Sequence, residues 1–165
     1  MAAEAVALLG FVTLQRLAEL AWSRRNERRL RARGAVEAGA GHYPVMVALH
    51  AAWLLSLWAF GWNRPVQPAW TALFFLLQLG RIWVLATLGE RWTTRVIVPP
   101  GEPLVRRGPY QFISHPNYLV VAMEIPVLPL ALGLPWLAVV FGVLNLAMLA
   151  WRLRVEASAL RPSSR

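Results

Sequence analysis

Long apolar stretches separated by short blocks of arginine limit most strongly what this chain can fold into. A helix needs about 20 apolar residues to cross a hydrocarbon core of about 30 Å. A spanning segment must also satisfy its own backbone hydrogen bonds, which a helix does. We therefore predict an all-α integral membrane protein with a single domain over residues 1–165. About five transmembrane helices are expected, at 5–22, 43–62, 70–88, 117–132 and 136–151.

The charged residues fall between the apolar stretches and favour one set of loops. All 17 basic residues are arginine, and all eight acidic residues are glutamate. Segments 23–42, 89–114 and 152–165 hold six, four and four arginines, whereas the loops on the other side hold only Arg64. Arginine-rich loops remain in the cytoplasm, so we expect the N-terminus outside and the C-terminus inside. The net charge of +9 then indicates contact with anionic membrane lipids rather than nucleic acid.

Two polar residues within the apolar stretches need an explanation. No second ligand lies three or four residues from His50, so we expect a hydrogen bond between helices rather than a metal site. The chain has no cysteine, which excludes disulfides and thiolate metal sites, and we predict no bound metal. A charge within a span is a candidate functional group, and Arg81 is either that or an ion-pair partner of Glu19, Glu90 or Glu124.

Residues 102–124 lead from a charged loop into the fourth apolar stretch. Pro116 suits the first position of a helix, and the free N–H groups at such an N-terminus can bind an anion such as a carboxylate. The loop also offers aromatic faces for a cation. Glu124 is either a buried partner of an arginine or a polar group that lines a pocket. This stretch is therefore the predicted cytoplasmic cofactor-binding loop.

The fourth and fifth stretches are predicted to form a C-terminal helical hairpin, because only Gly133 to Pro135 separate them. The start of the fourth stretch should therefore lie beside the end of the fifth. Arg152 and Glu156, four residues apart, share one face if the helix continues beyond the membrane. In front of the loop, Trp92 to Val98 is rich in β-branched residues. We expect it to lie extended along the membrane face and not to belong to a sheet.

The spacing of the motifs resembles a known family. Gly-Pro-Tyr at 108–110 is followed after four residues by His-Pro-x-Tyr at 115–118, and Arg-x-x-x-Glu follows the hairpin at 152–156. This pattern resembles the isoprenylcysteine carboxyl methyltransferase family over 102–160. The segments QRLAELAWSRRN and GAVEAGAGHYPVMVALH further resemble a bacterial branch of small five-span enzymes. Members of that branch are often associated with type III polyketide synthases and methylate alkylpyrone or alkylresorcinol lipids.

The resemblance implies S-adenosylmethionine as cofactor, a bacterial cytoplasmic membrane, and a lipophilic acceptor that enters from the bilayer. Arg152 and Glu156 would be catalytic. Arg152 would also contact the substrate, together with Glu124. If the acceptor is a phenol or enol, Glu156 or His115 could act as base. The cofactor would be bound by Arg95, Glu102, Pro103, Leu104, Val105, Tyr110, His115, Pro116, Asn117, Tyr118 and Glu156.

Two positions depart from the family pattern, and two other functions are compatible with the sequence. Ser114 stands where the family usually has arginine, and Ala157 where it often has a second acid. A similar hairpin occurs in membrane sterol and enone reductases, which bind a nicotinamide cofactor. A non-catalytic membrane scaffold would instead use its polar residues to hold helices together.

Overall fold

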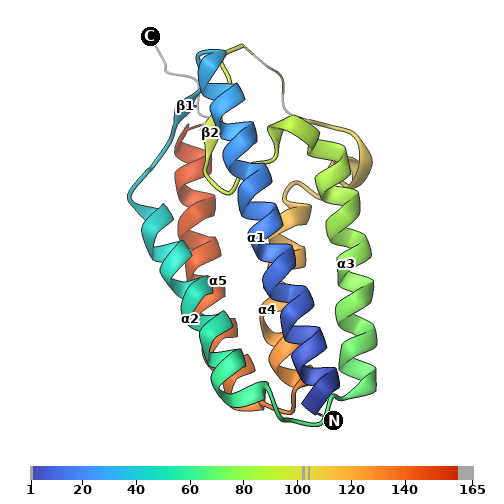
Figure 1. Ribbon diagram of the computed structural model, residues 1–165. Coiled ribbons are helices and arrows are strands. Elements are labelled where there is room, and N and C mark those ends of the chain that lie inside the picture. Colours follow the sequence, from blue (N-terminus) through green and yellow to red (C-terminus); the bar gives the residue numbers. More distant parts are fainter. Residues whose placement is uncertain (1, 102, 104, 160–165) are drawn as a thin grey trace.

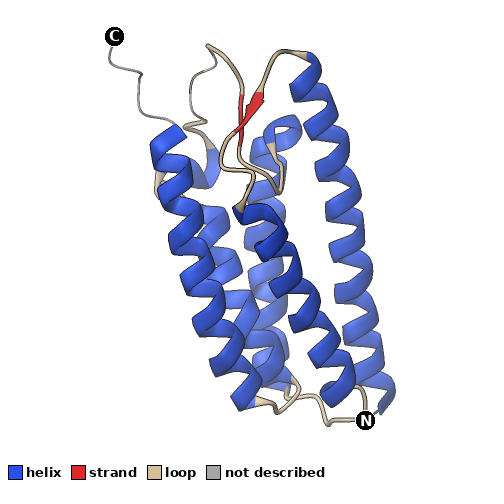
Figure 2. Ribbon diagram, turned by 90° about the vertical axis from the view of Figure 1, so that its left-hand side faces the viewer, coloured by secondary structure: helices blue, strands red, loops and turns tan. Residues whose placement is uncertain are grey.

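Over the residues that the structure describes, the fold is a bundle of five α-helices, which lie side by side along one axis with a small strand pair at one end (Figures 1 and 2). The computed structural model describes residues 2–101, 103 and 105–159. The helices are α1 (Ala2–Ala32), α2 (His42–Gly61), α3 (Pro68–Leu88), α4 (Pro116–Ala131) and α5 (Pro135–Ala159). The other elements are strands β1 (Val36–Glu37) and β2 (Ile97–Val98) and the 3-10 turns η1 (Gly89–Arg91) and η2 (Gly108–Gln111).

Length and apolar composition make this a multi-pass membrane protein. Helices α1, α2, α3 and α5 are each long and apolar enough to span a bilayer, and α4 is a shorter apolar helix of 16 residues. Large apolar side chains such as Leu14, Leu55 and Val139 point outward and are exposed. Such an apolar surface is typical of contact with lipid. The predicted all-α membrane fold is confirmed.

A compact apolar core joins α1, α2, α3, α4 and α5, and one indole links two of these helices. Trp53 of α2 is buried, and its Nε1 donates a hydrogen bond of 3.1 Å to the carbonyl of Ile125 in α4. That carbonyl lacks its helical partner, because Pro129, four residues later, has no N–H. The tryptophan therefore satisfies a group that the proline leaves unpaired within the membrane.

The predicted hairpin is present. Helices α4 and α5 are joined by a turn at Leu132–Leu134, in which Gly133 adopts a φ of +66°. This left-handed conformation favours glycine. The turn returns the chain along α4, so the first residues of α4 lie beside the last turns of α5 (Figure 1). The end of the bundle that carries β1, β2, η1 and η2 is called the basic end below.

Two predictions about local structure at the basic end are wrong. The segment 23–32 is a continuation of α1 rather than a loop, and Arg31 bonds Glu27 one turn earlier on that helix. The segment 92–98 does contribute to a sheet, because Ile97–Val98 pairs antiparallel with Val36–Glu37. The partner strand follows α1, far away in sequence, so a local pattern of β-branched residues could not reveal it.

Candidate functional site

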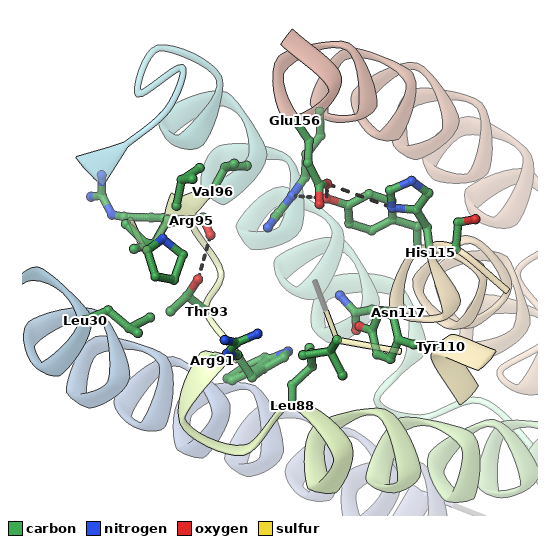
Figure 3. A pocket seen from close by; sticks show the side chains of 18 of the residues that line it. Leu30, Leu88, Arg91, Thr93, Arg95, Val96, Tyr110, His115, Asn117 and Glu156 are labelled. Carbon is green, nitrogen blue, oxygen red and sulfur yellow. Dashed lines mark hydrogen bonds and ion pairs between the residues drawn. The ribbon is translucent and has the colours of Figure 1, made fainter. Parts of the chain in front are cut away.

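A cavity of about 800 Å³, called the polar cavity below, lies at the basic end (Figure 3). It lies between the start of α4, the end of α5, segment 91–99 and residues 103 and 105–115. It brings together most of the predicted site residues. Pro116 is buried at the start of α4 and is absent from the lining, and Glu102 and Leu104 lie outside the described residues. The predicted residues that line this polar cavity are Arg95, Pro103, Val105, Tyr110, His115, Asn117, Tyr118, Arg152 and Glu156.

The hydroxyl of Tyr118 joins the two predicted catalytic residues. It donates a hydrogen bond of 2.5 Å to Oε2 of Glu156 and accepts one of 2.9 Å from Nε of Arg152. Nη1 of Arg152 donates to the carbonyl of Thr94 at 2.8 Å and lies 3.2 Å from Sδ of Met46. Arg152 is only 9% exposed. Contacts from three other segments therefore fix the direction of a buried cation.

The aromatic residues of the loop surround the same carboxylate. His115 stacks on the ring of Tyr118 with 5.2 Å between centroids, and its Nδ1 lies 4.0 Å from Oε2 of Glu156. Burial, and secondarily the Glu156 carboxylate, raise the pKa of Tyr110 to about 12. Tyr110 is therefore neutral at neutral pH and can donate a hydrogen bond.

The N-terminus of α4 offers less for an anion than the sequence indicates. The backbone N–H groups of Tyr118 and Leu119 both donate to the carbonyl of His115, at 3.1 and 3.3 Å. The N–H of Leu119 makes the first regular bond of the helix, so of these two groups only that of Tyr118 is one that the sequence left available to a ligand.

The glycine of the Gly-Pro-Tyr motif has a structural reason. Gly108 has a φ of +57°, and a Cβ at this position would collide with the side chain of Thr87 at the end of α3. Only glycine allows η2 to approach α3 this closely. The motif therefore positions the loop that forms one wall of the polar cavity.

Arg95 lines the polar cavity and also forms an ion pair with Glu37 of β1. Its Nη1 lies 2.6 Å from Oε1 of Glu37, and its guanidinium lies 3.9 Å from the ring centre of Tyr43. Burial opposes ionisation of Glu37, but hydrogen bonds from Arg95 and Arg31 outweigh it, so the pKa of Glu37 is lowered. The strand pair and Arg95 thus stabilise each other.

Sequence reasoning missed the residues that hold segment 89–96 over the site. Nδ2 of the buried Asn26 donates to the carbonyls of Gly89 and Trp92, at 3.0 and 2.8 Å. The hydroxyl of Ser23 accepts from the Thr94 N–H at 2.7 Å. Ser23 and Asn26 are the uncharged polar residues in an arginine-rich block. Their spacing of three places them on one helix face. This shared face was the feature of the sequence that could have revealed their role.

A second cavity, of about 260 Å³, lies within the bundle between α1, α2 and α5, and we refer to it as the membrane cavity. Its outer edge is apolar, with Leu17 of α1 58% exposed and Val47 of α2 44% exposed. Its lining overlaps that of the polar cavity, so the two cavities adjoin. The residues that line both are Trp92, Thr93, Asn117, Tyr118 and Arg152.

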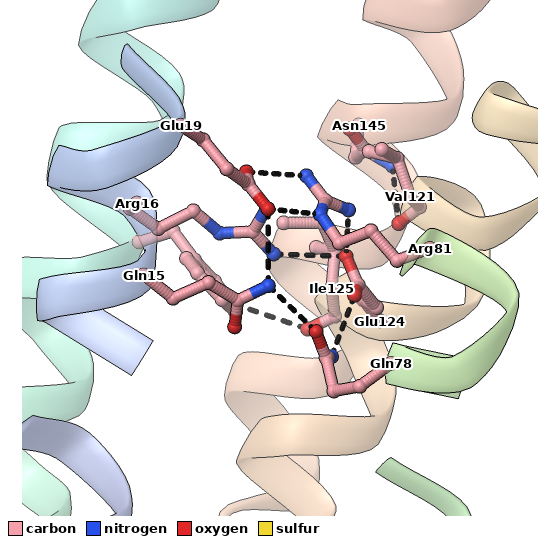
Figure 4. A network of polar contacts seen from close by, with 10 residues as sticks. Gln15, Arg16, Glu19, Gln78, Arg81, Val121, Glu124, Ile125 and Asn145 are labelled. Carbon is pink, nitrogen blue, oxygen red and sulfur yellow. Dashed lines mark hydrogen bonds and ion pairs between the residues drawn. The ribbon is translucent and has the colours of Figure 1, made fainter. Parts of the chain in front are cut away.

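A buried network of charges lies beside the membrane cavity (Figure 4). Oε2 of Glu124 accepts hydrogen bonds from Arg16 and Arg81, at 2.8 and 2.5 Å, and Oε1 accepts one from Gln78 at 2.7 Å. Glu19 receives two hydrogen bonds from Arg81, at 2.5 and 2.9 Å, and one of 3.0 Å from Arg16. Two arginines and two glutamates therefore balance in charge among α1, α3 and α4.

The network shows which of the candidate glutamates pair with Arg81, and it shows that Glu124 is buried among polar partners. Arg81 pairs with Glu19 and Glu124, whereas Glu90 pairs with arginines at the basic end. Glu124 is 0% exposed and is absent from the lining of both cavities. The structure thus does not bring Glu124 to the expected position beside a substrate, because two arginines and a glutamine occupy its carboxylate.

The comparison with known proteins agrees with the motifs of this site. Residues 70–162 match the family model of the isoprenylcysteine carboxyl methyltransferase (ICMT) family. The chain belongs to the ICMT family. This confirms the resemblance that the motifs indicated, and it makes the protein a membrane methyltransferase. ICMT family enzymes in general use S-adenosylmethionine, and the matched region contains α4, α5 and nearly all of α3 and of the polar cavity.

Two relatives share most of the chain. The "Uncharacterized protein YpbQ" of Bacillus subtilis (strain 168) is 37% identical over 162 residues, which cover 95% of this chain and 96% of that protein. An "Uncharacterized protein" of Haemophilus influenzae is 26% identical over 152 residues, which cover 88% of each chain. No solved structure matches this ICMT family member.

Proposed function

We propose that the protein transfers a methyl group from S-adenosylmethionine to an oxygen of a lipophilic acceptor. The junction of the two cavities at Arg152 and Tyr118 carries this proposal. A water-soluble donor can reach the polar cavity from the basic end, and a lipid can reach the membrane cavity between α1 and α2. Their reactive groups would then meet at one point that buried side chains hold rigidly.

The residues of the polar cavity fit S-adenosylmethionine. The volume of about 800 Å³ lies within the range of about 300–1,000 Å³ that is usual for small-molecule sites. Oδ1 of Asn117 and Nε1 of Trp92 are buried and have no hydrogen-bond partner within the described residues. They supply an acceptor and a donor for a polar ligand. The carboxylate of Glu156 can accept from amino or hydroxyl groups, and Tyr110 and His115 offer aromatic faces to a cation.

The chain's own contribution to the reaction is alignment. The cofactor supplies an electrophilic methyl group on a sulfonium ion. Displacement at that carbon requires the acceptor oxygen in line, so positioning dominates. Arg152 can orient a carboxylate, or stabilise the negative charge of a phenolate, at the junction. If the acceptor is a phenol or enol, Glu156 or His115 can take its proton.

An alkylpyrone or alkylresorcinol lipid and a prenylcysteine carboxylate are the two acceptor classes that we propose. The decisive experiment is a methyl-transfer assay in lipid vesicles with labelled S-adenosylmethionine. An alkylpyrone, an alkylresorcinol and a prenylcysteine are tested side by side as acceptors. We expect label in at least one lipid product. Calorimetric titrations with S-adenosylmethionine and with NADPH accompany the assay. Binding of NADPH alone would instead support the reductase alternative.

We further propose that the protein lies in a bacterial cytoplasmic membrane with the basic end in the cytoplasm. The arginine distribution supports this orientation. Because the chain has no cysteine, single substitutions give an unambiguous test. In intact cells, an impermeant thiol reagent should label Asn63→Cys and should leave Ala157→Cys unlabelled until the membrane is opened. The reverse pattern would overturn the orientation.

A further inference from the structure

His50 lines the membrane cavity with one ring nitrogen available to a ligand. Its Nδ1 lies 2.9 Å from the carbonyl oxygen of Met46, one turn earlier on α2, so the expected hydrogen bond to another helix is wrong and the bond lies within α2. A carbonyl can only accept, so Nδ1 carries the hydrogen, and in a neutral imidazole Nε2 is then an acceptor. Within the described residues Nε2 has no hydrogen-bond partner, and it is not among the fully buried atoms. The cavity therefore contains an accessible acceptor that the methyl-transfer mechanism does not use.

The inner wall of the membrane cavity is polar beyond this one residue. Arg16, Glu19, Arg81 and Asn145 also line it. Figure 4 shows Arg16, Glu19 and Arg81 pointing toward one another, whereas Asn145 points toward the backbone of α4. A cavity that held only a hydrocarbon tail would gain nothing from polar side chains within the membrane, where each such group is unfavourable. Arg16, Glu19 and Arg81 bind one another in the charge network, but Nε of Arg16 and Oδ1 of Asn145 are buried without a hydrogen-bond partner within the described residues. Together with Nε2 of His50, these unpaired groups indicate a ligand that has polar substituents at this depth.

The position of His50 separates it from the reacting group. The Sδ of Met46 lies 3.2 Å from Nη1 of Arg152, at the junction of the cavities. His50 is four residues further along α2, and therefore about 6 Å deeper in the bundle. It lines the membrane cavity and not the polar cavity. An acceptor whose reacting oxygen lies at Arg152 would thus place a neighbouring substituent beside the imidazole.

We propose that His50 determines acceptor specificity: its Nε2 accepts a hydrogen bond from a hydroxyl group of the acceptor other than the oxygen that receives the methyl group. This inference rests on the proposed function and narrows it. The favoured acceptor is an alkyl-substituted ring with two hydroxyl groups. A prenylcysteine has no hydroxyl on its hydrocarbon part and would leave Nε2 unpaired.

Two probes that differ by one hydroxyl test the proposal: 5-pentadecylresorcinol and 3-pentadecylphenol. The full-length protein in lipid nanodiscs is assayed for kcat and KM of methyl transfer. Binding of each probe is measured in parallel by its effect on thermal unfolding. We expect the wild type to prefer the resorcinol by about 10-fold or more in kcat/KM, because a site built for a hydroxyl discriminates against its absence. The difference should lie mainly in KM.

The variants separate a hydrogen bond from a structural effect. His50→Phe should lose the preference through weaker use of the resorcinol alone, with the phenol changed less than about threefold. His50→Gln keeps an acceptor oxygen on a chain of similar length and should retain part of the preference. Leu55→Phe, on the lipid-facing side of the same helix, is the matched control and should behave as the wild type.

Each other outcome overturns the role of His50. For the wild type, these outcomes are equal kcat/KM with both probes, or failure of both probes to react and to bind. For His50→Phe, they are a preference that persists, or an equal loss of kcat/KM with both probes. Titration with S-adenosylmethionine distinguishes this failure from that of the proposed function. If S-adenosylmethionine binds and any acceptor is methylated, the proposed function stands and only the role of His50 is wrong.

Discussion

Nε of Arg152 lies 2.9 Å from the hydroxyl of Tyr118, and the same hydroxyl donates to Glu156. One phenol from the start of α4 thus connects Arg152 and Glu156 of α5. It also lies where the polar and membrane cavities adjoin. Contacts to this oxygen, together with those of Arg152 to Thr94 and Met46, therefore set the relative positions of Arg152 and Glu156.

Tyr118→Phe should lower the rate of methyl transfer while leaving the fold intact. The ring keeps its stacking on His115, but Arg152 and Glu156 lose their shared partner. Hydrogen bonds to charged groups contribute about 1.5–3 kcal/mol, so kcat should fall about 10- to 100-fold. The KM for S-adenosylmethionine should change less than the rate. Phe112→Ala, at a side chain that is 78% exposed, is the control, and an unchanged kcat in Tyr118→Phe would contradict the prediction.

Glu156→Gln should retain more cofactor binding than Glu156→Ala. The amide oxygen of glutamine can still accept a hydrogen bond from Tyr118 and from a ligand, whereas alanine offers none. Calorimetric titration with S-adenosylmethionine measures the difference. Equal loss of affinity in the two variants would show that Glu156 does not act by hydrogen bonding.

Arg81→Met should destabilise the protein strongly. Its removal leaves Glu19 and Glu124 with Arg16 as their only arginine in the network described above. An uncompensated buried charge costs about 3–5 kcal/mol, and thermal unfolding in detergent should show a correspondingly lower midpoint. The exposed Arg64, on the loop between α2 and α3, provides the control as Arg64→Gln, which we expect to be neutral.

The double variant Arg81→Met/Glu124→Gln tests whether charge balance is the reason. One arginine and one glutamate then remain, so its unfolding midpoint should lie above that of Arg81→Met alone. A midpoint lower than that of the single variant would indicate that packing, rather than charge, dominates the effect.

The strand pair at the basic end should lose stability in acid. The folded-state pKa of Glu37 lies below its ordinary value of 4.5. Its contribution is therefore complete above that value and is lost as the pH falls through the lowered pKa. Amide-exchange protection factors of the β1–β2 ladder, measured at pH 7 and pH 3, should fall in the wild type. In Glu37→Gln they should be low at both pH values.

The motifs and the hairpin could be predicted because they depend on neighbouring residues. The turn at Gly133 is too short for anything but antiparallel helices, so it brings Tyr118 close to Arg152 and Glu156 wherever the rest of the chain lies. The choice among three partners for Arg81 was different. It depended on how α1, α3 and α4 rotate about their axes, which the hydrophobic pattern does not specify when helices are apolar on most sides.

The sequence by itself determined the membrane class, the approximate helices and the family of this protein. Apolar length, arginine blocks and motif spacing are local properties of the chain. Only the tertiary structure decided that α1 continues past the membrane so that Asn26 holds segment 89–96, and that residues 36–37 and 97–98 form a sheet. It also placed His50 in the wall of a cavity that adjoins the polar one. Each of these features requires contacts between segments far apart in the chain, and the packing of the whole bundle selects those contacts.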